Sequence, residues 1–440
     1  MIFSPTLFAG QRYAVVGLGK NGLPAAQALC AMGAEVMAWD DAEEKRAGAA
    51  AAGIVVREPA FSGLTALVLS PGIPHALPKP HPIAARAIAA GVPILSDAEL
   101  LYRAVRAAGS RAKFAGITGT NGKSTTTALL AHILEVAGTP VAAGGNLGTA
   151  ALALPLLPDD GVYVLEMSSY MLERIETLRF DAAAMLNLSA DHIDRHGDMA
   201  GYAHAKRAIF DRQTRDDLAV IGTDDAPSRE MAAWLHMRPA TVVEISERDQ
   251  VPGIERAPAL PGAHNAQNAA AASVMAAFLG AASGKIVEGL ATYPGLPHRQ
   301  ERVTEIDGVV FVNDSKATNA DSAARALGCY DRLIWIAGGQ AKEGGIEPLT
   351  PYFSRIALAL LIGRDAPLLA ATLAAHGVPH RNVGTLQAAV AQAWTAARSG
   401  GANVVLLSPA CASWDQFTGF DQRGDSFRAL AQRIAREKAA

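Results

Sequence analysis

One stretch restricts the possible folds of this chain more than any other, the glycine-rich run GITGTNGKST at residues 116–125. It follows a short apolar run at 114–115 and precedes a pattern typical of a helix over 125–136. A glycine-rich turn that enters a helix directs several backbone N–H groups toward one point, where the helix dipole adds positive potential. The strict pattern GxxxxGK[ST] is not met, because Ile117 stands in the place of its first glycine. We therefore predict a variant P-loop that binds ATP, rather than a simple turn.

Two side chains of this loop match the chemistry of a P-loop. Lys123 is expected to reach the β- and γ-phosphates, and the Ser124 hydroxyl to hold Mg²⁺. The predicted ATP contacts of the loop are Gly119, Thr120, Asn121, Gly122, Lys123, Ser124 and Thr125.

Composition limits the class of protein. With 440 residues, of which 50% are hydrophobic, the chain has room for several cores, and its length suggests about three domains. A net charge of −3 gives no general attraction to nucleic acid or to an anionic membrane. The three cysteines are far apart, and no run approaches the apolar length of a transmembrane helix. We expect a cytoplasmic, monomeric protein that binds neither nucleic acid nor membrane.

The first predicted domain, residues 1–108, alternates strands with helices. A strand at 13–16 leads into GLGKNG at 17–22, and a second strand at 35–39 ends at Asp40. This is the pattern of a dinucleotide-binding fold, for which NAD is the direct interpretation. Another ligand with a pyrophosphate and a ribose, or a purely structural turn, are the alternatives. A third strand at 67–70 stops at Pro71-Gly72, at the edge where open α/β sheets bind ligands.

The second predicted domain, residues 109–297, contains the P-loop and further polar strand ends. A strand at 162–165 delivers Glu166, which is placed to hold Mg²⁺, and a strand at 183–188 precedes His192. From the residues alone, His192 is either structural or a ligand of metal or phosphate. Lys206, on a predicted helix at 201–210, is by composition a solvated lysine. Residues 230–260 are weakly patterned and are interpreted as short strands.

Two asparagines introduce a predicted helix at 269–279. Asn265 and Asn268 either cap this helix or bind the base or ribose of a nucleotide.

The third predicted domain, residues 298–440, has three strands that end in polar residues, at 309–312, 333–336 and 404–407. Because ligands bind at the carboxyl edge of a doubly wound sheet, these tips form a candidate site. Cys411 has no adjacent histidine and is interpreted as a packing residue.

The motifs taken together resemble the Mur ligase family, whose members join amino acids to UDP-muramoyl precursors of peptidoglycan. The strings that carry the resemblance are VVGLGKNG, LSPGIP, GITGTNGKST, GGNLG, LEMSS, ADHIDRH, HNAQN, GLPHR, NDSKATN and LLSPACASWDQF. They cover nearly the whole chain, and the last two are typical of the branch that adds D-glutamate. One departure is Met171, where similar proteins commonly carry glutamine.

The resemblance implies an α/β fold of three domains: a Rossmann-like UDP-binding domain, a P-loop ATP-binding central domain and a Rossmann-like C-terminal domain. It implies an ATP-dependent ligase that adds D-glutamate to UDP-N-acetylmuramoyl-L-alanine through an acyl phosphate. Two Mg²⁺ ions and a carbamylated Lys206 are implied cofactors. The implied metal ligands are Ser124, Glu166, His192 and Lys206, and the implied catalytic residues are Lys123, His192, Lys206 and Lys316.

The resemblance also assigns binding residues. The implied contacts to the adenine, ribose and phosphates of ATP are Asn265, Asn268, Arg299 and Asp314. The implied contacts to UDP and its sugar are Leu18, Lys20, Asn21, Asp40, Gly72 and Asn146. Those framing D-glutamate are Thr318, Lys342, Ser413 and Phe420.

Three other interpretations remain open at this point. An NAD-dependent dehydrogenase would explain the first loop but not the P-loop. A non-catalytic nucleotide-binding protein would explain both loops but not the polar strand ends of the third domain. A ligase similar to folylpolyglutamate synthase is the nearest enzymatic alternative.

Overall fold

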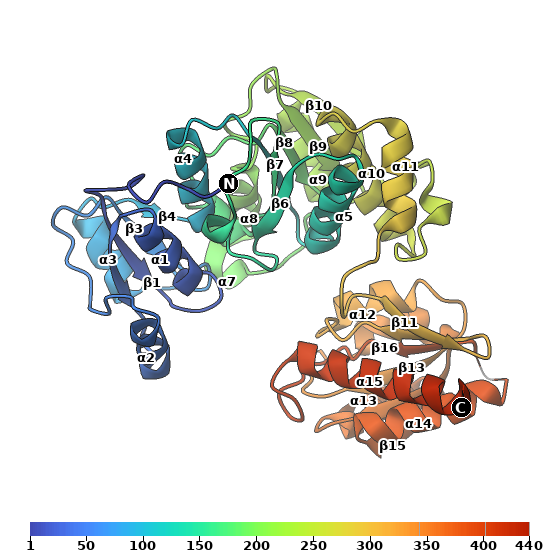
Figure 1. Ribbon diagram of the computed structural model, residues 1–440. Coiled ribbons are helices and arrows are strands. Elements are labelled where there is room, and N and C mark those ends of the chain that lie inside the picture. Colours follow the sequence, from blue (N-terminus) through green and yellow to red (C-terminus); the bar gives the residue numbers. More distant parts are fainter. Residues whose placement is uncertain (343, 401, 440) are drawn as a thin grey trace. The chain divides into compact units, whose positions relative to one another are not determined.

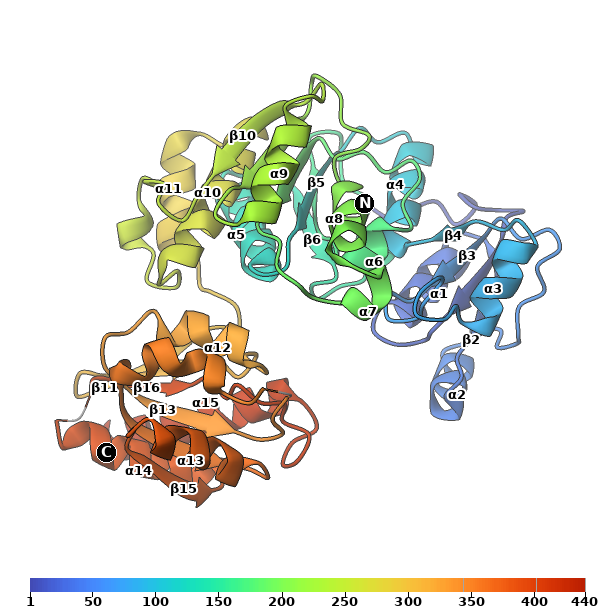
Figure 2. The ribbon, with the colours of Figure 1, turned by 180° about the vertical axis from the view of Figure 1, so that it is seen from behind.

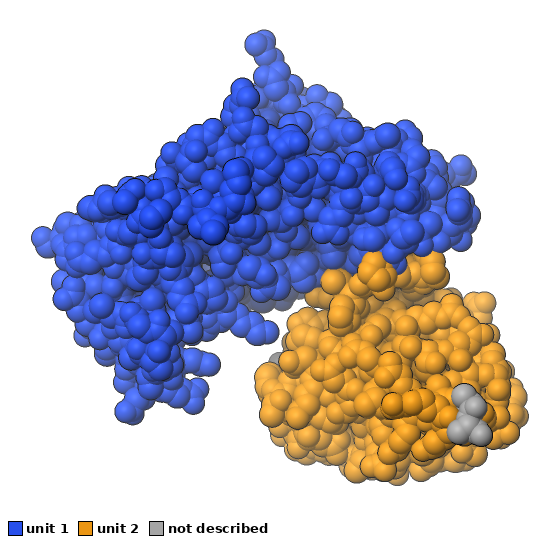
Figure 3. All heavy atoms as spheres, in the orientation of Figure 1, with its two compact units in different colours: residues 1–256, 265–293 blue, residues 257–264, 294–440 orange. Residues whose placement is uncertain are grey.

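Three sheets flanked by helices make up the computed structural model, which describes residues 1–342, 344–400 and 402–439 (Figure 1). Each sheet lies within one of the predicted spans 1–108, 109–297 and 298–440. The chain divides into two units, residues 1–256 with 265–293, and residues 257–264 with 294–440 (Figure 3). The first unit contains two of the sheets, and the second unit contains the third.

The first sheet is parallel, with strand order β2-β1-β3-β4. Its strands are β1 (Arg12–Val16), β2 (Glu35–Trp39), β3 (Ala66–Leu69) and β4 (Ile94–Leu95), and its helices are α1 (Gly22–Ala31), α2 (Glu43–Ala51) and α3 (Pro82–Ala89). The glycine-rich turn predicted at 17–22 connects β1 to α1, as the dinucleotide-binding pattern requires.

The central sheet is also parallel, with strand order β10-β9-β8-β5-β7-β6. Its strands are β5 (Lys113–Thr118), β6 (Val141–Gly145), β7 (Val162–Glu166), β8 (Ala182–Met185), β9 (Leu218–Gly222) and β10 (Thr241–Ile245). Register pairs Ile117 with Glu166 and Thr118 with Met185. The carboxyl ends of β5, β7 and β8 therefore meet where the P-loop leaves the sheet.

Helices cover both faces of the central sheet, with α8 and α9 on one face and α5 and α11 on the other (Figures 1 and 2). The helical elements of this region are α4 (Asp97–Ala107), α5 (Lys123–Val136), η1 (Ala151–Ala153), α6 (Ser169–Leu172), α7 (Ile193–His196), α8 (Met199–Arg207), α9 (Ala226–Leu235), η2 (Ile254–Arg256), α10 (Ala263–Phe278) and α11 (Ser283–Thr292).

The first and central sheets share one hydrophobic core. It runs from Val15 and Leu29 through Leu100 on α4 to Phe114 on β5 and Leu165 on β7. Continuous burial of this kind gives the two sheets a common source of stability. The segment around the predicted boundary between residues 108 and 109 is held by Arg106, which donates to the carbonyls of Ser110 and Ala112.

The third sheet has strand order β11-β12-β16-β13-β14-β15, and only β11 runs antiparallel to its neighbour. Its elements are β11 (Glu301–Ile306), β12 (Val309–Asn313), α12 (Ala320–Leu327), β13 (Leu333–Gly338), η3 (Glu347–Arg355), β14 (Ile356–Ile362), α13 (Ala366–Ala375), β15 (His380–Gly384), α14 (Leu386–Arg398), β16 (Val404–Leu407) and α15 (Phe420–Ala439).

Alternating side chains of the third sheet face two separate hydrophobic cores. Phe311 packs with α14 and α15 on one face, and the adjacent Val312 packs with α12 and α13 on the other. A strand buried on both faces needs this continuous apolar run, which is why 309–312 was recognisable in the sequence.

Several sequence-based expectations for elements need correction. The region at 230–260, interpreted as short strands, contains the second half of helix α9, the strand β10 and the short helix η2. Asp225 caps α9 by accepting from the Ser228 N–H. The helix expected at 269–279 begins at Ala263, so Asn265 and Asn268 lie inside it rather than capping it. Strand β8 ends at Met185, three residues before its predicted end at Leu188. Within the described residues, no helix has the length and apolar character needed to span a bilayer.

Candidate functional site

The P-loop is held open by two glycines in conformations that other residues rarely adopt. Gly119 has φ 141° and Gly122, the N-cap of α5, has φ 85°. The turn brings the Lys123 side chain back over the loop, where its Nζ donates to the carbonyls of Gly119 at 2.9 Å and Thr120 at 2.8 Å. The lysine charge therefore lies at the mouth of the loop, at the N-terminus of α5, where phosphate is expected.

A neighbouring asparagine sets the shape of the loop. The Thr120 N–H donates to the Asn187 carbonyl at 2.9 Å, and the Asn121 N–H donates to Asn187 Oδ1 at 2.8 Å. Asn187 follows β8 and was not singled out from the sequence. Its signal was available, because it is a polar residue just past the carboxyl end of a buried parallel strand.

Asn268 lies against the same loop. A Cβ added to Gly122 would lie 2.3 Å from Asn268 Oδ1, so only glycine leaves room for this amide. Asn268 Nδ2 also donates to Asn265 Oδ1 at 3.0 Å. The structure thus brings both predicted adenine-region residues to the P-loop from α10.

Lys206 is buried, with 1% of its surface exposed, so the expectation of a solvated lysine from composition is wrong. Its Nζ donates to the Gly119 carbonyl at 2.8 Å and to Thr118 Oγ1 at 3.3 Å. Burial, assisted by the charge of Lys123, lowers the pKa of Lys206 well below its ordinary value. The amine is thereby shifted toward its neutral, nucleophilic form.

Glu166 presents a carboxylate oxygen to the same region. The residue is 2% exposed; its Oε1 accepts from Asn146 Nδ2 at 2.7 Å, and its buried Oε2 has no hydrogen-bond partner. A buried carboxylate oxygen without a partner is costly unless a cation occupies the adjacent space. With the Ser124 hydroxyl at the start of α5, this donor set fits Mg²⁺. No preformed group of three or more His, Cys, Asp and Glu side chains occurs among the described residues.

His192 has a left-handed backbone, with φ 53°, at the start of α7. Its ring lies 5.0 Å from the Tyr170 ring, and its Nε2 is 3.4 Å from Asp191. Partial burial lowers the pKa of His192, with smaller contributions in the same direction from Lys123 and Lys206 and an opposing one from Asp191. The neutral imidazole that this favours is the form that binds a metal.

The first-sheet residues form a separate cluster around the 17–22 turn. Asp40 holds this turn, since its carboxylate accepts from the backbone N–H groups of Leu18 at 2.7 Å and Ala42 at 2.9 Å. Asn21 donates to the Gly145 carbonyl at 3.2 Å, which ties the turn to the loop that carries Asn146. Lys20 is exposed. Contacts of these residues with UDP stay predictions.

The third sheet gathers its polar residues at the carboxyl ends of β12, β13 and β16. Asp314 Oδ2 accepts from Ser408 Oγ at 2.8 Å, and its Oδ1 accepts from the Gln300 N–H at 3.2 Å. Burial raises the pKa of Asp314 to about 7, although these hydrogen bonds and the charge of Arg299 oppose the shift. Lys316 Nζ lies 3.8 Å from the centre of the Phe420 ring, a cation–π contact.

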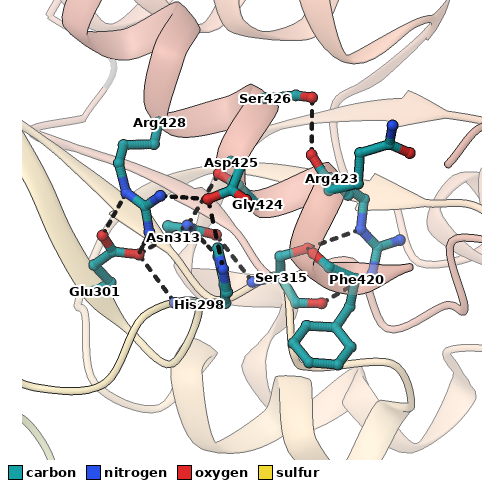
Figure 4. Close-up of polar contacts among 11 residues, drawn as sticks. His298, Glu301, Asn313, Ser315, Phe420, Arg423, Gly424, Asp425, Ser426 and Arg428 are labelled. Atoms are coloured by element: carbon teal, nitrogen blue, oxygen red, sulfur yellow. Dashed lines mark hydrogen bonds and ion pairs between the residues drawn. The ribbon is translucent and has the colours of Figure 1, made fainter. Parts of the chain in front are cut away.

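One arginine that the sequence reading missed holds this edge together. Arg423 is 1% exposed and donates to the Ser315 carbonyl at 2.9 Å and the Cys411 carbonyl at 3.1 Å. Its Nε donates to Ser315 Oγ at 3.0 Å (Figure 4). Loops after β12 and β16 are therefore joined through one guanidinium. Cys411 is fully buried, which confirms its interpretation as a packing residue.

A second network in Figure 4 supports the segment that precedes β11. Arg428 makes a two-pronged ion pair with Glu301, at 2.8 and 2.9 Å, and Asn313 Nδ2 donates to Glu301 at 3.0 Å. The His298 N–H donates to the same carboxylate at 2.9 Å. The bond from His298 to Glu301 positions the neighbouring Arg299.

Of the remaining predicted residues, Ser413 is buried, Thr318 is half-buried and Lys342 is exposed.

Fold and site together define a P-loop α/β protein with a second polar site on a separate doubly wound sheet. Models of the Mur ligase middle domain and of the Mur ligase, glutamate ligase domain match residues 117–257 and 298–411. The chain is 50% identical to the UDP-N-acetylmuramoylalanine–D-glutamate ligase of Paramagnetospirillum magneticum, over 100% of both chains. It is 47% identical to the ligase of the same name from Caulobacter vibrioides, over 96% of each chain. The chain belongs to the Mur ligase family.

Solved structures show the same architecture. The UDP-N-acetylmuramoylalanyl-D-glutamyl-2,6-diaminopimelate–D-alanyl-D-alanyl ligase of Acinetobacter baumannii matches with a TM-score of 0.59 and 16% identity, over 98% of this chain and 92% of that one. The UDP-N-acetylmuramate–alanine ligase of Thermotoga maritima matches with a TM-score of 0.56 and 18% identity, over 96% and 99%. At these identities the likeness concerns the fold alone.

Proposed function

We propose that this chain is an ATP-dependent ligase that joins D-glutamate to the carboxyl group of UDP-N-acetylmuramoyl-L-alanine. The observation that carries the proposal is the full-length match, at 50% identity, to a relative named for this activity. In the first step the γ-phosphoryl group of ATP passes to the alanyl carboxylate, which gives an acyl phosphate and ADP. The D-glutamate amine then attacks the carbonyl carbon, the amine loses a proton, and phosphate leaves as the amide forms.

Phosphoryl transfer depends mainly on alignment and on neutralising charge. Backbone N–H groups of the Gly119–Thr125 loop bind the phosphate oxygens, and Lys123 supplies a positive charge as the γ-phosphoryl group moves. The proximity of Asn268 to Gly122 supports a role for Asn265 and Asn268 beside the nucleotide.

Mg²⁺, when bound, neutralises phosphate charge and aligns the transferred group. Glu166, Ser124 and His192 are the residues that would hold it. The orphaned Oε2 of Glu166 supports this assignment. We propose that two Mg²⁺ ions bind and that His192 is a ligand of the second ion.

Lys206 is proposed to act as its carbamate. Its amine is buried beside Gly119 and its pKa is lowered, mainly by burial, so the neutral form that reacts with CO₂ is favoured. The amine nitrogen bonds to the carbon of CO₂ and releases one proton. The product is an anionic oxygen ligand of the kind that Mg²⁺ prefers.

The third sheet is proposed to receive the amino acid and part of the nucleotide. Asp314 and Arg299 are assigned to ribose and phosphate, and Lys316 to the transferred phosphate. The residues proposed to frame D-glutamate are Thr318, Lys342, Ser413 and Phe420. The contact between Lys316 and Phe420 supports placing these two residues in one site.

The first sheet is proposed to bind UDP through Leu18, Lys20, Asn21, Asp40 and Gly72, with Asn146 beside the substrate. A dehydrogenase is not favoured, because the family match covers the P-loop and the third sheet, which a dehydrogenase would leave without a role. A ligase similar to folylpolyglutamate synthase is not favoured, because the full-length relatives carry the D-glutamate ligase name. Cytoplasmic location and a monomeric state stay predictions.

An assay of ADP release tests the function. The purified chain, ATP, Mg²⁺ and UDP-N-acetylmuramoyl-L-alanine are combined with each of a panel of amino acids, and the product is identified by mass. We expect release of ADP and phosphate with D-glutamate and not with L-glutamate or with folate in place of the UDP substrate. Equal turnover without the UDP substrate, or none with D-glutamate, would contradict the proposal.

A further inference from the structure

A turn of the first sheet rests on an arginine from the central sheet region. Arg174, which follows α6, donates to the carbonyls of Leu69 at 2.8 Å, Ser70 at 3.2 Å and Ile73 at 2.6 Å. Its Nε donates to His75 Nδ1 at 3.2 Å. The side chain is 2% exposed, so these bonds are shielded from water. One guanidinium therefore fixes the directions of three carbonyl groups in the turn that contains Gly72.

A second arginine holds the same turn. Arg195 on α7 donates to the Gly72 carbonyl at 3.0 Å, and its guanidinium lies 4.3 Å from the centre of the Tyr170 ring. Tyr170 in turn stacks on His196, with centroids 5.7 Å apart and planes inclined by 15°. The two arginines thus approach the turn from α6 and α7.

A buried hydrogen-bond chain locks α6 to α7. His196 Nδ1 lies 3.0 Å from Glu173 Oε1, and its Nε2 lies 2.9 Å from Ser169 Oγ. Glu173 precedes Arg174, and His196 follows Arg195. Glu173 and His196, which pair across the two helices, are therefore each adjacent to an arginine that bonds to the turn.

The charge of the pair suits an anionic ligand at the turn. Arg174 and Arg195 place two cations beneath a backbone segment whose carbonyl oxygens already face them. Water and salt screen the charge of a buried arginine weakly, so its electrostatic attraction reaches farther than that of an exposed lysine. A diphosphate bound at this edge of the sheet would be attracted by it.

We propose that Arg174 and Arg195 are positioning residues that hold the 69–73 turn in the shape that receives the diphosphate-bearing substrate. The inference rests on the proposed function, because that function supplies the UDP group. Arg174 carries most of the effect, since it makes more bonds to the turn and is the more deeply buried of the two. A lysine cannot replace it, because one ammonium group does not reach carbonyls in three directions.

The test compares Arg174→Lys with the matched control Arg212→Lys. Arg212 is half-buried and donates to two backbone carbonyls, those of Leu178 at 2.7 Å and Ala208 at 2.9 Å, but these lie outside the turn. Two measurements are made on the full chain: the Kd of UDP-N-acetylmuramoyl-L-alanine by calorimetry without ATP, and amide hydrogen exchange of peptides covering 66–76.

For Arg174→Lys we expect a rise in the Kd and KM of the UDP substrate of about tenfold or more. The KM for ATP should change less than about threefold, because the P-loop has its own contacts to Asn187 and Asn268. Exchange in peptides over 66–76 should accelerate. Arg212→Lys should leave all of these close to the wild-type values.

Two results would overturn the inference: a UDP-substrate Kd in Arg174→Lys equal to that of the wild type, or equal changes in both variants. Failure of the proposed function has a different signature, since the wild-type chain would then neither bind the UDP substrate nor release ADP with D-glutamate. Should Arg174→Lys fold poorly, Arg195→Lys provides the second variant. It removes the directional bond to Gly72 alone, and we expect a smaller rise in Kd with the same unchanged KM for ATP.

Discussion

Lys123 and Lys206 donate hydrogen bonds to the same acceptor, the carbonyl oxygen of Gly119, at 2.9 and 2.8 Å. Two lysine amines around one oxygen atom repel each other if both are protonated. Burial, assisted by the charge of Lys123, pushes Lys206 toward its neutral form. Lys123 at the start of α5 and Lys206 on α8 therefore meet the same oxygen atom from different environments.

Lys123→Ala should abolish ligation while the UDP substrate still binds. Loss of the charge beside the transferred phosphoryl group should lower kcat by about 10² to 10³-fold or more. Calorimetry should give a Kd for the UDP substrate near that of the wild type, because the first-sheet turn is unchanged. Lys285→Ala, which removes an exposed lysine paired with Glu288, is the control. An equal loss of UDP-substrate affinity in Lys123→Ala would contradict the assignment of the two ligands to different loops.

Lys206→Arg should be nearly inactive although it keeps a positive charge, because a guanidinium does not form a carbamate. Lys206→Ala should regain part of its activity when a small carboxylate such as acetate is added, since this supplies an anionic oxygen. Turnover at several acetate concentrations checks the rescue, with Lys123→Ala as a variant that acetate should not rescue. Good activity in Lys206→Arg would show that the residue acts only as a cation.

Gly122→Ala should impair nucleotide binding beyond its effect on stability. The added methyl would lie 2.3 Å from Asn268 Oδ1 and would displace that amide from the P-loop. Gly138→Ala is a matched control, because Gly138 has φ 83° just beyond the other end of α5 and nothing within 4 Å of an added Cβ. Both variants should lose on the order of 1 kcal/mol of unfolding free energy from backbone strain. Only Gly122→Ala should raise the KM for ATP, by roughly tenfold. A similar KM for ATP in both variants would contradict the proposed contact between the P-loop and Asn268.

Asp97→Asn should change the dependence of stability on pH. Burial raises the pKa of Asp97 from 3.8 to about 6, so between these values the folded chain binds a proton that the unfolded chain does not. This contribution is fully present below about pH 4 and is lost as pH rises toward 6. The wild type should lose roughly 2 to 3 kcal/mol of unfolding free energy over this range from Asp97 alone. Denaturant unfolding between pH 4 and 7 should show a flatter profile for Asp97→Asn.

The exposed Asp160 provides the comparison for this prediction. Asp160→Asn should leave the pH profile as in the wild type. Parallel profiles for Asp97→Asn and the wild type would mean that the Asp97 carboxylate is stabilised in its charged form by the Ala151 N–H and Asn21, at odds with the expected shift.

Much of the fold was accessible from the sequence because its signals are local. Strand β2 was predicted with its observed bounds, Glu35–Trp39, and buried parallel strands such as β16 appear as short apolar runs. The P-loop was recognisable because its glycines and Lys123 are constrained by backbone geometry within a few residues. Helix α9 was missed, because its buried apolar side chains Met231, Ala232 and Leu235 are confined to its second half, which is too short to show a helical period.

Sequence alone determined which residues have the chemistry for phosphate and metal, since a Gly-Lys-Ser turn and a strand-end glutamate keep these properties in many contexts. Only the tertiary structure decided how those groups are charged and held. Burial against a loop 87 residues earlier in the chain lowers the pKa of Lys206, and Arg174 bonds to a turn about 100 residues away. Hydrogen bonds and desolvation depend on neighbours in space, and no local pattern specifies those neighbours.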